Sequence, residues 1–225
     1  MNEDYKLEFL VSPETKIKFR HGIHTYRCQD NELLIGKNVF STHEIVFPTV
    51  KLSSKDGSYI PETQVRLSLV DVRSTPDNVK EHYHKLIECK DCKRPGLSWN
   101  ITKVLQSGSN IVTFDNLGIV RTKGPDQIQA VSERLLERRR ECGDTVSGTW
   151  DMNRIRDLAA DSVLETSDKE LRLCIEAYVF QEDGSILELA RILSSIVQDM
   201  TDANGSITIR KRNICSDSVR LGDMN

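Results

Sequence analysis

A β-sandwich interrupted by a helical segment is the fold that the sequence predicts. The strongest observation is the stretch 171–180, where apolar residues alternate with a mixed polar and aromatic set. Such alternation indicates an antiparallel strand with one face on the core and the other half exposed to water. The second observation is the number of similar short stretches separated by turn residues, which is typical of an all-β sandwich. The expected core face consists of Leu171, Leu173, Ile175, Ala177 and Val179.

The other predicted strands are short. They cover residues 16–20, 25–28, 45–50, 64–73, 99–105 and 110–121. Proline lacks the N–H that a strand ladder needs, so Pro48 places its strand at a sheet edge or a strand end. The Glu-Asp-Gly-Ser sequence at 182–185 supplies a turn that sends the chain back after the central strand. Residues 1–14 are interpreted as an N-terminal tail.

Residues 125–166 carry a helical period instead. Asp126 is a candidate N-cap for a first helix ended by Gly143, and Thr149 is a candidate N-cap for a second. Arg134 and the run 138–140 are interpreted as a solvated face paired with neighbouring glutamates, with contact to a DNA minor groove or to a partner protein as the alternative. The expected apolar stripes are Ile128, Val131 and Leu135 in the first helix, and Ile155, Leu158, Ala159 and Val163 in the second.

Composition narrows the functional classes. The net charge of the 225 residues is −3, so any nucleic-acid affinity must come from locally clustered lysine and arginine. No apolar run reaches the length of a membrane span, and the N-terminus lacks a signal-peptide pattern. We therefore expect no membrane partner, and six cysteines that are reduced thiols in the cytoplasm or nucleus. No nucleophile motif, phosphate-binding loop or metalloprotease motif occurs, so we expect neither an enzyme nor a cofactor.

Two histidines and two cysteines invite a zinc interpretation. His82, His84, Cys89 and Cys92 follow the pattern H-x-H-x4-C-x2-C. A structural zinc site usually requires two knuckles that close a tetrahedron, and a single C-x2-C supplies only one. We expect no metal here.

Four segments resemble, in the same order, signature segments of the Rel/NF-κB transcription factors. They are 84–92 (similar to H-x-L-V-G-K-D-C with one insertion), 114–119 (F-x-N-L-G-I), 172–178 (R-L-C-F-x-A-F) and 218–223 (S-V-R-G-G-D). The resemblance implies an immunoglobulin-like (p53-like) β-sandwich over 15–207, with a helical insert at about 125–166 as in the NF-κB1/Relish type. Residues 208–225 would then be a linker and the start of a dimerisation domain that is not included.

The resemblance also implies a DNA-reading loop of the form R-x-R-Y-x-C-E-G, whose arginines fit guanine edges through their bidentate fork. The corresponding stretch is 19–30, in which Tyr26 and Cys28 match, and Thr25 stands at the second arginine. A second registration puts Arg20 in the arginine position, with residues 21–24 inserted. The sequence leaves both registrations open. The candidate DNA contacts of this loop are Arg20, Tyr26, Arg27 and Cys28.

Two further contact sets are reduced relative to the family pattern. Of a K-K-K run after the N-L-G-I segment, only Lys123 remains. In the interdomain linker the key basic position falls on Thr208, and Arg210 and Lys211 follow as candidate phosphate contacts. Each lost phosphate contact weakens DNA binding and flattens its dependence on salt.

The leading functional hypothesis is a sequence-specific DNA-binding domain of the Rel/NF-κB type that acts as a dimer in immune or stress signalling. The expected partners are double-stranded DNA with a G-rich site, a Rel-family subunit bound through the absent domain, and an ankyrin-repeat inhibitor. The expected localisation is cytoplasm and nucleus. The altered loop supports an alternative, in which a Rel-derived interaction module or decoy has lost base-specific recognition.

Overall fold

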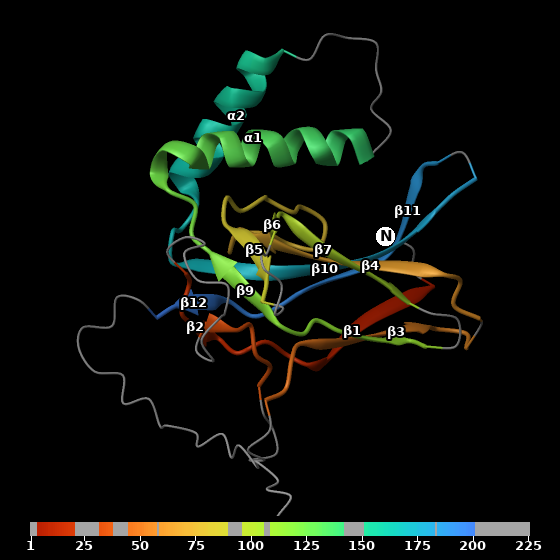
Figure 1. The fold of residues 1–225 in the computed structure, drawn as a ribbon. Helices are drawn as coiled ribbons and strands as arrows, with labels where there is room; N and C mark the ends of the chain where they lie inside the picture. The colour runs from red at the N-terminus through yellow and green to blue at the C-terminus, as the bar shows by residue number, and fades with distance from the viewer. Residues whose placement is uncertain are drawn as a thin grey trace, which may run out of the picture.

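The computed structural model describes residues 4–20, 32–37, 45–57, 59–89, 96–105, 109–141, 151–182 and 184–200. Strands build the body of the molecule, and two helices lie together on one side of it (Figure 1). The elements in chain order are β1 (Tyr5–Val11), β2 (Lys16–Ile17), β3 (Thr49–Ser54), β4 (Thr63–Val70), β5 (Lys85–Glu88), β6 (Leu97–Ser98), β7 (Asn100–Leu105), β8 (Ile111–Thr113), β9 (Leu117–Val120), α1 (Gly124–Glu141), α2 (Met152–Glu165), β10 (Glu170–Phe180), β11 (Ile186–Leu193) and β12 (Val197–Asp199).

Strand β10 is the central strand, as the alternation predicts. It pairs antiparallel with β4, from Arg172 opposite Val70 to Tyr178 opposite Gln64. The largest sheet has the order β2-β12-β10-β4-β7, and β11 pairs with β10 as well. The predicted turn after β10 is confirmed by the Gln181 N–H, which donates to the Ser185 carbonyl at 2.8 Å. Gly184 adopts a φ of 81°, which glycine reaches without steric cost.

Two three-stranded sheets, β1-β3-β8 and β6-β5-β9, complete the sandwich. The expectation of a tail over residues 1–14 is wrong for β1, which pairs antiparallel with β3 and buries Leu7 in the core. The predicted strand 110–121 is two strands, because Asn116 takes a φ of 55° and directs β8 and β9 into different sheets. Strand β3 begins directly after Pro48, in agreement with a proline at a strand end.

The main core lies between the sheets. The inward face of β10 is buried there with strands β3, β4, β5 and β9. The immunoglobulin-like sandwich with a helical insertion is thereby confirmed. The fully buried side chains at its centre include Leu67, Leu69, Phe114, Leu117, Ile119, Leu173 and Ile175.

The helical insertion lies where the sequence predicts it, but its details differ. Helix α1 begins at Gly124, two residues before Asp126, which lies in the first turn. Thr149 is not the N-cap of α2, because the Asp151 carboxylate accepts from the Asn153 N–H at 3.0 Å and the Arg154 N–H at 3.3 Å. Gly143 and Thr149 lie outside the described residues. Val131, Ile155 and Ala159 are buried, Leu135 and Val163 are partly buried, and Ile128 and Leu158 remain 38% and 45% exposed.

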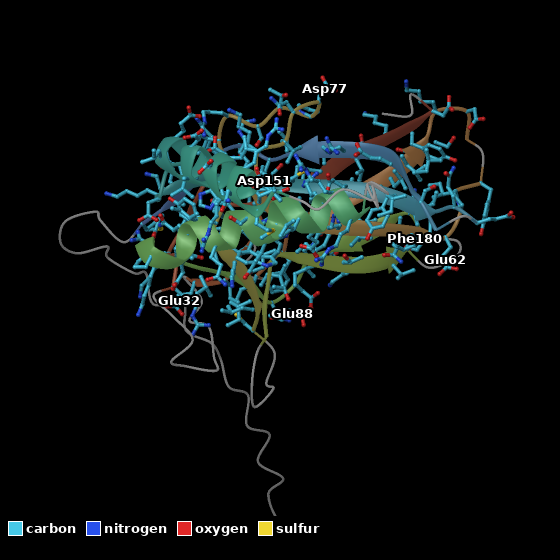
Figure 2. All side chains as sticks on the ribbon, turned by 90° about the horizontal axis from the view of Figure 1, so that it is seen from above. Glu32, Glu62, Asp77, Glu88, Asp151 and Phe180 are labelled. Atoms are coloured by element: carbon cyan, nitrogen blue, oxygen red, sulfur yellow. The ribbon has the colours of Figure 1, made fainter. Side chains whose placement is uncertain are left out.

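The insertion covers the second face of β10, so this face is buried from solvent under the helices. Cys174, Glu176 and Tyr178 are buried there, and the expectation of a half-exposed face is wrong for them. Phe180 lies beyond the end of α1 in Figure 2 and is 56% exposed. The alternation predicted which residues share a face. It could not predict that 125–166 would cover that face.

The solvated-face interpretation of α1 is also wrong for two of its arginines. Arg134 and Arg138 both pair with the buried carboxylate of Glu81. Arg138 reaches Glu176 as well, at 3.4 Å. Arg139 and Arg140, by contrast, are exposed. Neither described helix is long and apolar enough to cross a membrane.

Candidate nucleic-acid interface

Two of the seven predicted DNA contacts fall within the described residues. These are Arg20, at the end of the segment that follows β2, and Lys123, just before α1. The predicted contacts at Tyr26, Arg27, Cys28, Arg210 and Lys211 lie outside the described residues and stay predictions.

Arg20 and Lys123 lie on neighbouring segments. The Arg20 N–H donates to the Ile119 carbonyl, and the Arg121 N–H donates to the Arg20 carbonyl, both at 2.8 Å. These bonds form a parallel bridge between Arg20 and Val120. The backbone therefore fixes the start of the predicted DNA-reading loop against the segment that leads to Lys123.

The strand that precedes the predicted linker joins the same corner. Strand β12 pairs in parallel with β2, and the Met200 N–H donates to the Ile17 carbonyl at 3.1 Å. Figure 1 shows β2 and β12 side by side at one end of the molecule. Three segments that are far apart in the sequence, ending at Arg20, Lys123 and Met200, are thus gathered at one corner.

A single carboxylate connects these three segments. The Asp199 side chain is fully buried, and its Oδ1 accepts from the Phe19 N–H at 3.0 Å. Its Oδ2 accepts from Nε of Arg121 at 2.6 Å and also from Nη2 of Arg121. Asp199 thus holds the residue before Arg20 and the segment of Lys123 from its own place at the end of β12. Sequence analysis missed this residue, because its two partners lie about 80 and 180 positions away.

Arg20 and Lys123 differ in how they meet solvent. The Arg20 side chain is 4% exposed, and its Nε lies 3.5 Å from Oε2 of Glu32. Glu32 also pairs with Lys18 at 3.5 Å. This arrangement does not present the Arg20 guanidinium to a base edge. Lys123 is exposed and is therefore the described candidate that can contact a phosphate directly.

A groove of about 380 Å³ lies beside Lys123, between the end of β9 and the first turns of α1. Its cationic side chains are Lys85, Arg121 and Lys123, and its anionic side chains are Asp126 and Glu133. Nζ of Lys85 lies 4.0 Å from the centroid of the Trp99 ring, a cation–π contact. The groove therefore carries mixed charge with a small cationic excess.

The histidines of the zinc pattern connect the two stems of the insertion. Nδ1 of His84 accepts from the Thr122 N–H at 3.3 Å, and its Nε2 lies 3.1 Å from the Asp168 carbonyl. Nε2 of His82 lies 3.0 Å from the Ser167 carbonyl in the same way. Burial lowers the pKa of His84 to about 4, and burial followed by the neighbouring imidazole lowers the pKa of His82 well below its ordinary value. These ring nitrogens are occupied by protein groups.

No cluster of metal-ligating side chains occurs among the residues that the structure describes. Of the cysteines there, Cys174 is free and buried, and burial raises the pKa of its thiol. Cys89 takes part in a disulfide bond, so the expectation of reduced thiols is wrong at this position.

Comparison with known families identifies the chain. The model of the Rel homology DNA-binding domain matches residues 7–200, which is most of the sequence. The chain belongs to this family. The Rel/NF-κB resemblance is thereby confirmed, and three of its four segments (84–92, 114–119 and 172–178) lie within the match. The segment 218–223 lies outside it, because the match ends at Met200, directly after the corner that Asp199 organises.

A solved structure supports the fold of this Rel homology domain independently. The structure described as the Dorsal homologue Gambif1 bound to DNA superposes with a TM-score of 0.56 at 22% sequence identity. The match covers 86% of this chain and 98% of the other. At this identity the likeness establishes the fold alone. A comparison with curated proteins found no match.

Proposed function

We propose that this Rel homology domain binds DNA sequence-specifically through the corner formed by the segments of Arg20, Lys123 and Met200. The observation that carries the proposal is the gathering of these three segments by backbone bonds and by Asp199. Lys123 lies in this corner, the predicted base-reading loop continues the chain from Arg20, and the chain leads on from Met200 toward the predicted linker. We therefore expect one duplex to meet all three. Phosphate contacts position a protein on DNA, and base contacts specify the sequence.

The biological setting follows from the family resemblance alone. We expect the full-length protein to act as a dimer, because pairing places two DNA-binding domains on two half-sites. The proposed context is transcriptional control in immune or stress signalling, with an ankyrin-repeat inhibitor as a regulator and with localisation in cytoplasm and nucleus. We expect no enzymatic activity and no cofactor.

One observation favours the alternative of an interaction module or decoy. The guanidinium of Arg20 is buried beside Glu32, so under the registration that uses Arg20 the base-reading group is already paired inside the protein. A domain in this condition retains phosphate contacts through Lys123 and loses the discrimination among bases. The alternative therefore predicts binding to all duplexes alike.

Fluorescence anisotropy separates the two functions. The chain is titrated against a G-rich Rel-type half-site and a scrambled duplex at two salt concentrations. Weak binding is expected, because a single module buries little surface and few basic contacts are present. Lys123→Ala should weaken the binding of both duplexes alike, since a lysine on a phosphate carries no sequence information. It should also reduce the slope of log K against log salt concentration by about 1. Lys55→Ala, in the turn after β3, is the matched control and should not change the affinity for either duplex.

The arginines decide between base reading and its loss. Whichever of Arg20 and Arg27 reads guanine, its change to alanine should remove about 1–3 kcal/mol of preference for the half-site. The alternative would be established if the wild-type domain bound both duplexes equally and if neither arginine substitution changed the affinity. If neither duplex binds at low salt, the proposed function itself fails.

A further inference from the structure

We infer that Asp199 is a positioning residue for DNA binding, and that it acts through Arg121. In this role its buried carboxylate sets the spacing between the segment of Lys123 and the start of the base-reading loop at Arg20. The inference rests on the proposed function, and it gives a buried acidic residue a role in binding a polyanion.

Asp199 shares its two carboxylate oxygens between the two segments. Oδ1 accepts the Phe19 N–H at 3.0 Å, and Oδ2 accepts Nε of Arg121 at 2.6 Å together with Nη2. Phe19 is fully buried, so its backbone cannot move without disturbing the core. The contact with Arg121 therefore ties the Lys123 segment to a fixed point of the sandwich.

The backbone supports the same geometry from the other side. Arg121 donates its own N–H to the Arg20 carbonyl, and its side chain binds Asp199, which in turn accepts from the Phe19 N–H. Nη1 of Arg121 also lies 4.0 Å from Oδ2 of Asp168, at the second stem of the helical insertion. A charge-assisted contact to two atoms of one guanidinium fixes direction as well as distance. Arg121 is thus held in place two residues before the exposed Lys123.

A positioning role and a simple charge effect predict opposite results for one substitution. Asp199→Asn keeps the size of the side chain but removes one negative charge. If only net charge mattered, DNA binding would become tighter, because a repulsive charge is lost. If Asp199 positions the contact segments, binding of the half-site should weaken by roughly 2- to 30-fold, the range typical of coupling through packed contacts.

A second pair of variants preserves the charge. Arg121→Lys leaves the net charge unchanged but replaces the planar fork by a single ammonium. This substitution should weaken binding to the half-site more than binding to the scrambled duplex. Arg66→Lys is the matched control, because Arg66 makes a similar buried contact to Glu176 at 3.0 Å, on the face of the sheet under α1. This control can lower stability but should leave the DNA preference and the salt slope unchanged.

Hydrogen exchange measured without DNA tests the coupling directly. In Asp199→Asn the amides of Phe19 and of 121–123 should exchange faster together, whereas in Arg66→Lys they should not. Faster exchange at Phe19 alone, or tighter DNA binding by Asp199→Asn, would overturn the inference. If the wild-type domain binds no DNA, the proposed function fails. Joint faster exchange would then support only the spacing role of Asp199, and the inferred role in DNA binding would fail with the proposed function.

Discussion

The two faces of β10 are buried by different chemistry. Its inner face packs on aliphatic and aromatic side chains of the sandwich core. Its outer face packs under α1, where Glu176 contacts Arg66 and Arg191 at 3.0 Å and Arg138 at 3.4 Å. Both faces exclude water, but the inner one requires only matching volume, whereas the outer one requires each charge to meet its partner.

Electrostatics at the outer face show how closely these partners are matched. Burial alone would raise the pKa of Glu176, but neighbouring guanidinium groups outweigh burial and hold this pKa below its ordinary value. The groups belong to Arg138, Arg66 and Arg191. The carboxylate is therefore charged at neutral pH although it is almost fully buried. The insertion is therefore attached to the sandwich by specific charge pairs in addition to a small apolar contact around Tyr83.

The largest effect is expected from removing the shared carboxylate. Glu176→Gln should lower the free energy of unfolding by about 3–5 kcal/mol, because it removes the buried negative charge that three guanidinium groups share. Urea unfolding at pH 7 measures it. Glu182→Gln, the same change at an exposed position of the following turn, should have almost no effect. Equal stabilities for the two variants would mean that the outer face is held by apolar contacts instead.

A cavity in the inner face should cost a similar or slightly smaller amount. Leu173→Ala removes a fully buried side chain and should destabilise the domain by about 2–5 kcal/mol. The exposed Arg139→Ala should change stability by about 0.5 kcal/mol or less. Leu173→Ala should cost the same at pH 7 and at pH 5, because no titrating group is lost. A strong pH dependence of this variant would contradict an apolar inner face.

The smallest expected effect is a pH dependence that arises at the stems of the insertion. The folded-state pKa of His84 is about 4, below the ordinary value of 6.5, so the unfolded chain takes up a proton first as the pH falls. Stability is therefore complete above about pH 6.5 and is lost toward pH 4, with about 2 kcal/mol lost between pH 7 and pH 5 through His84. Unfolding measured across this range should show a shallower slope in His84→Gln. Identical slopes would exclude His84 as a source.

Local patterns predicted the elements of this fold but not their long-range contacts. The alternation of 171–180 and the helical period of 125–166 are properties of neighbouring residues, and both were found where expected. Strand β1 was missed because its apolar stretch is short and its partner, β3, lies about 45 residues later. The dry outer face of β10 was missed because its burial depends on where α1 packs.

In the candidate site, too, the local motif was predictable and the long-range contacts were not. Lys123 is identified by a short motif and is exposed as a phosphate contact requires. The burial of Arg20 depends on Glu32, and the corner depends on Asp199, which bonds to residues far away in sequence. A single sequence gives no signal for such pairs, because any acidic residue could serve as the partner.

Glu81 makes the sandwich dependent on the helical insertion. Its ion-pair partners Arg134 and Arg138 both come from α1, although Glu81 itself belongs to the segment between β4 and β5. The stems of the insertion meet at His84, so shortening the chain there would require little rearrangement of the backbone. Deleting 124–165 would nevertheless leave the carboxylate of Glu81 without both guanidinium partners, and the domain would need compensating substitutions in the sandwich before it could lose its helices. Removal of the insertion therefore requires little change in the backbone but a new solution for a buried charge.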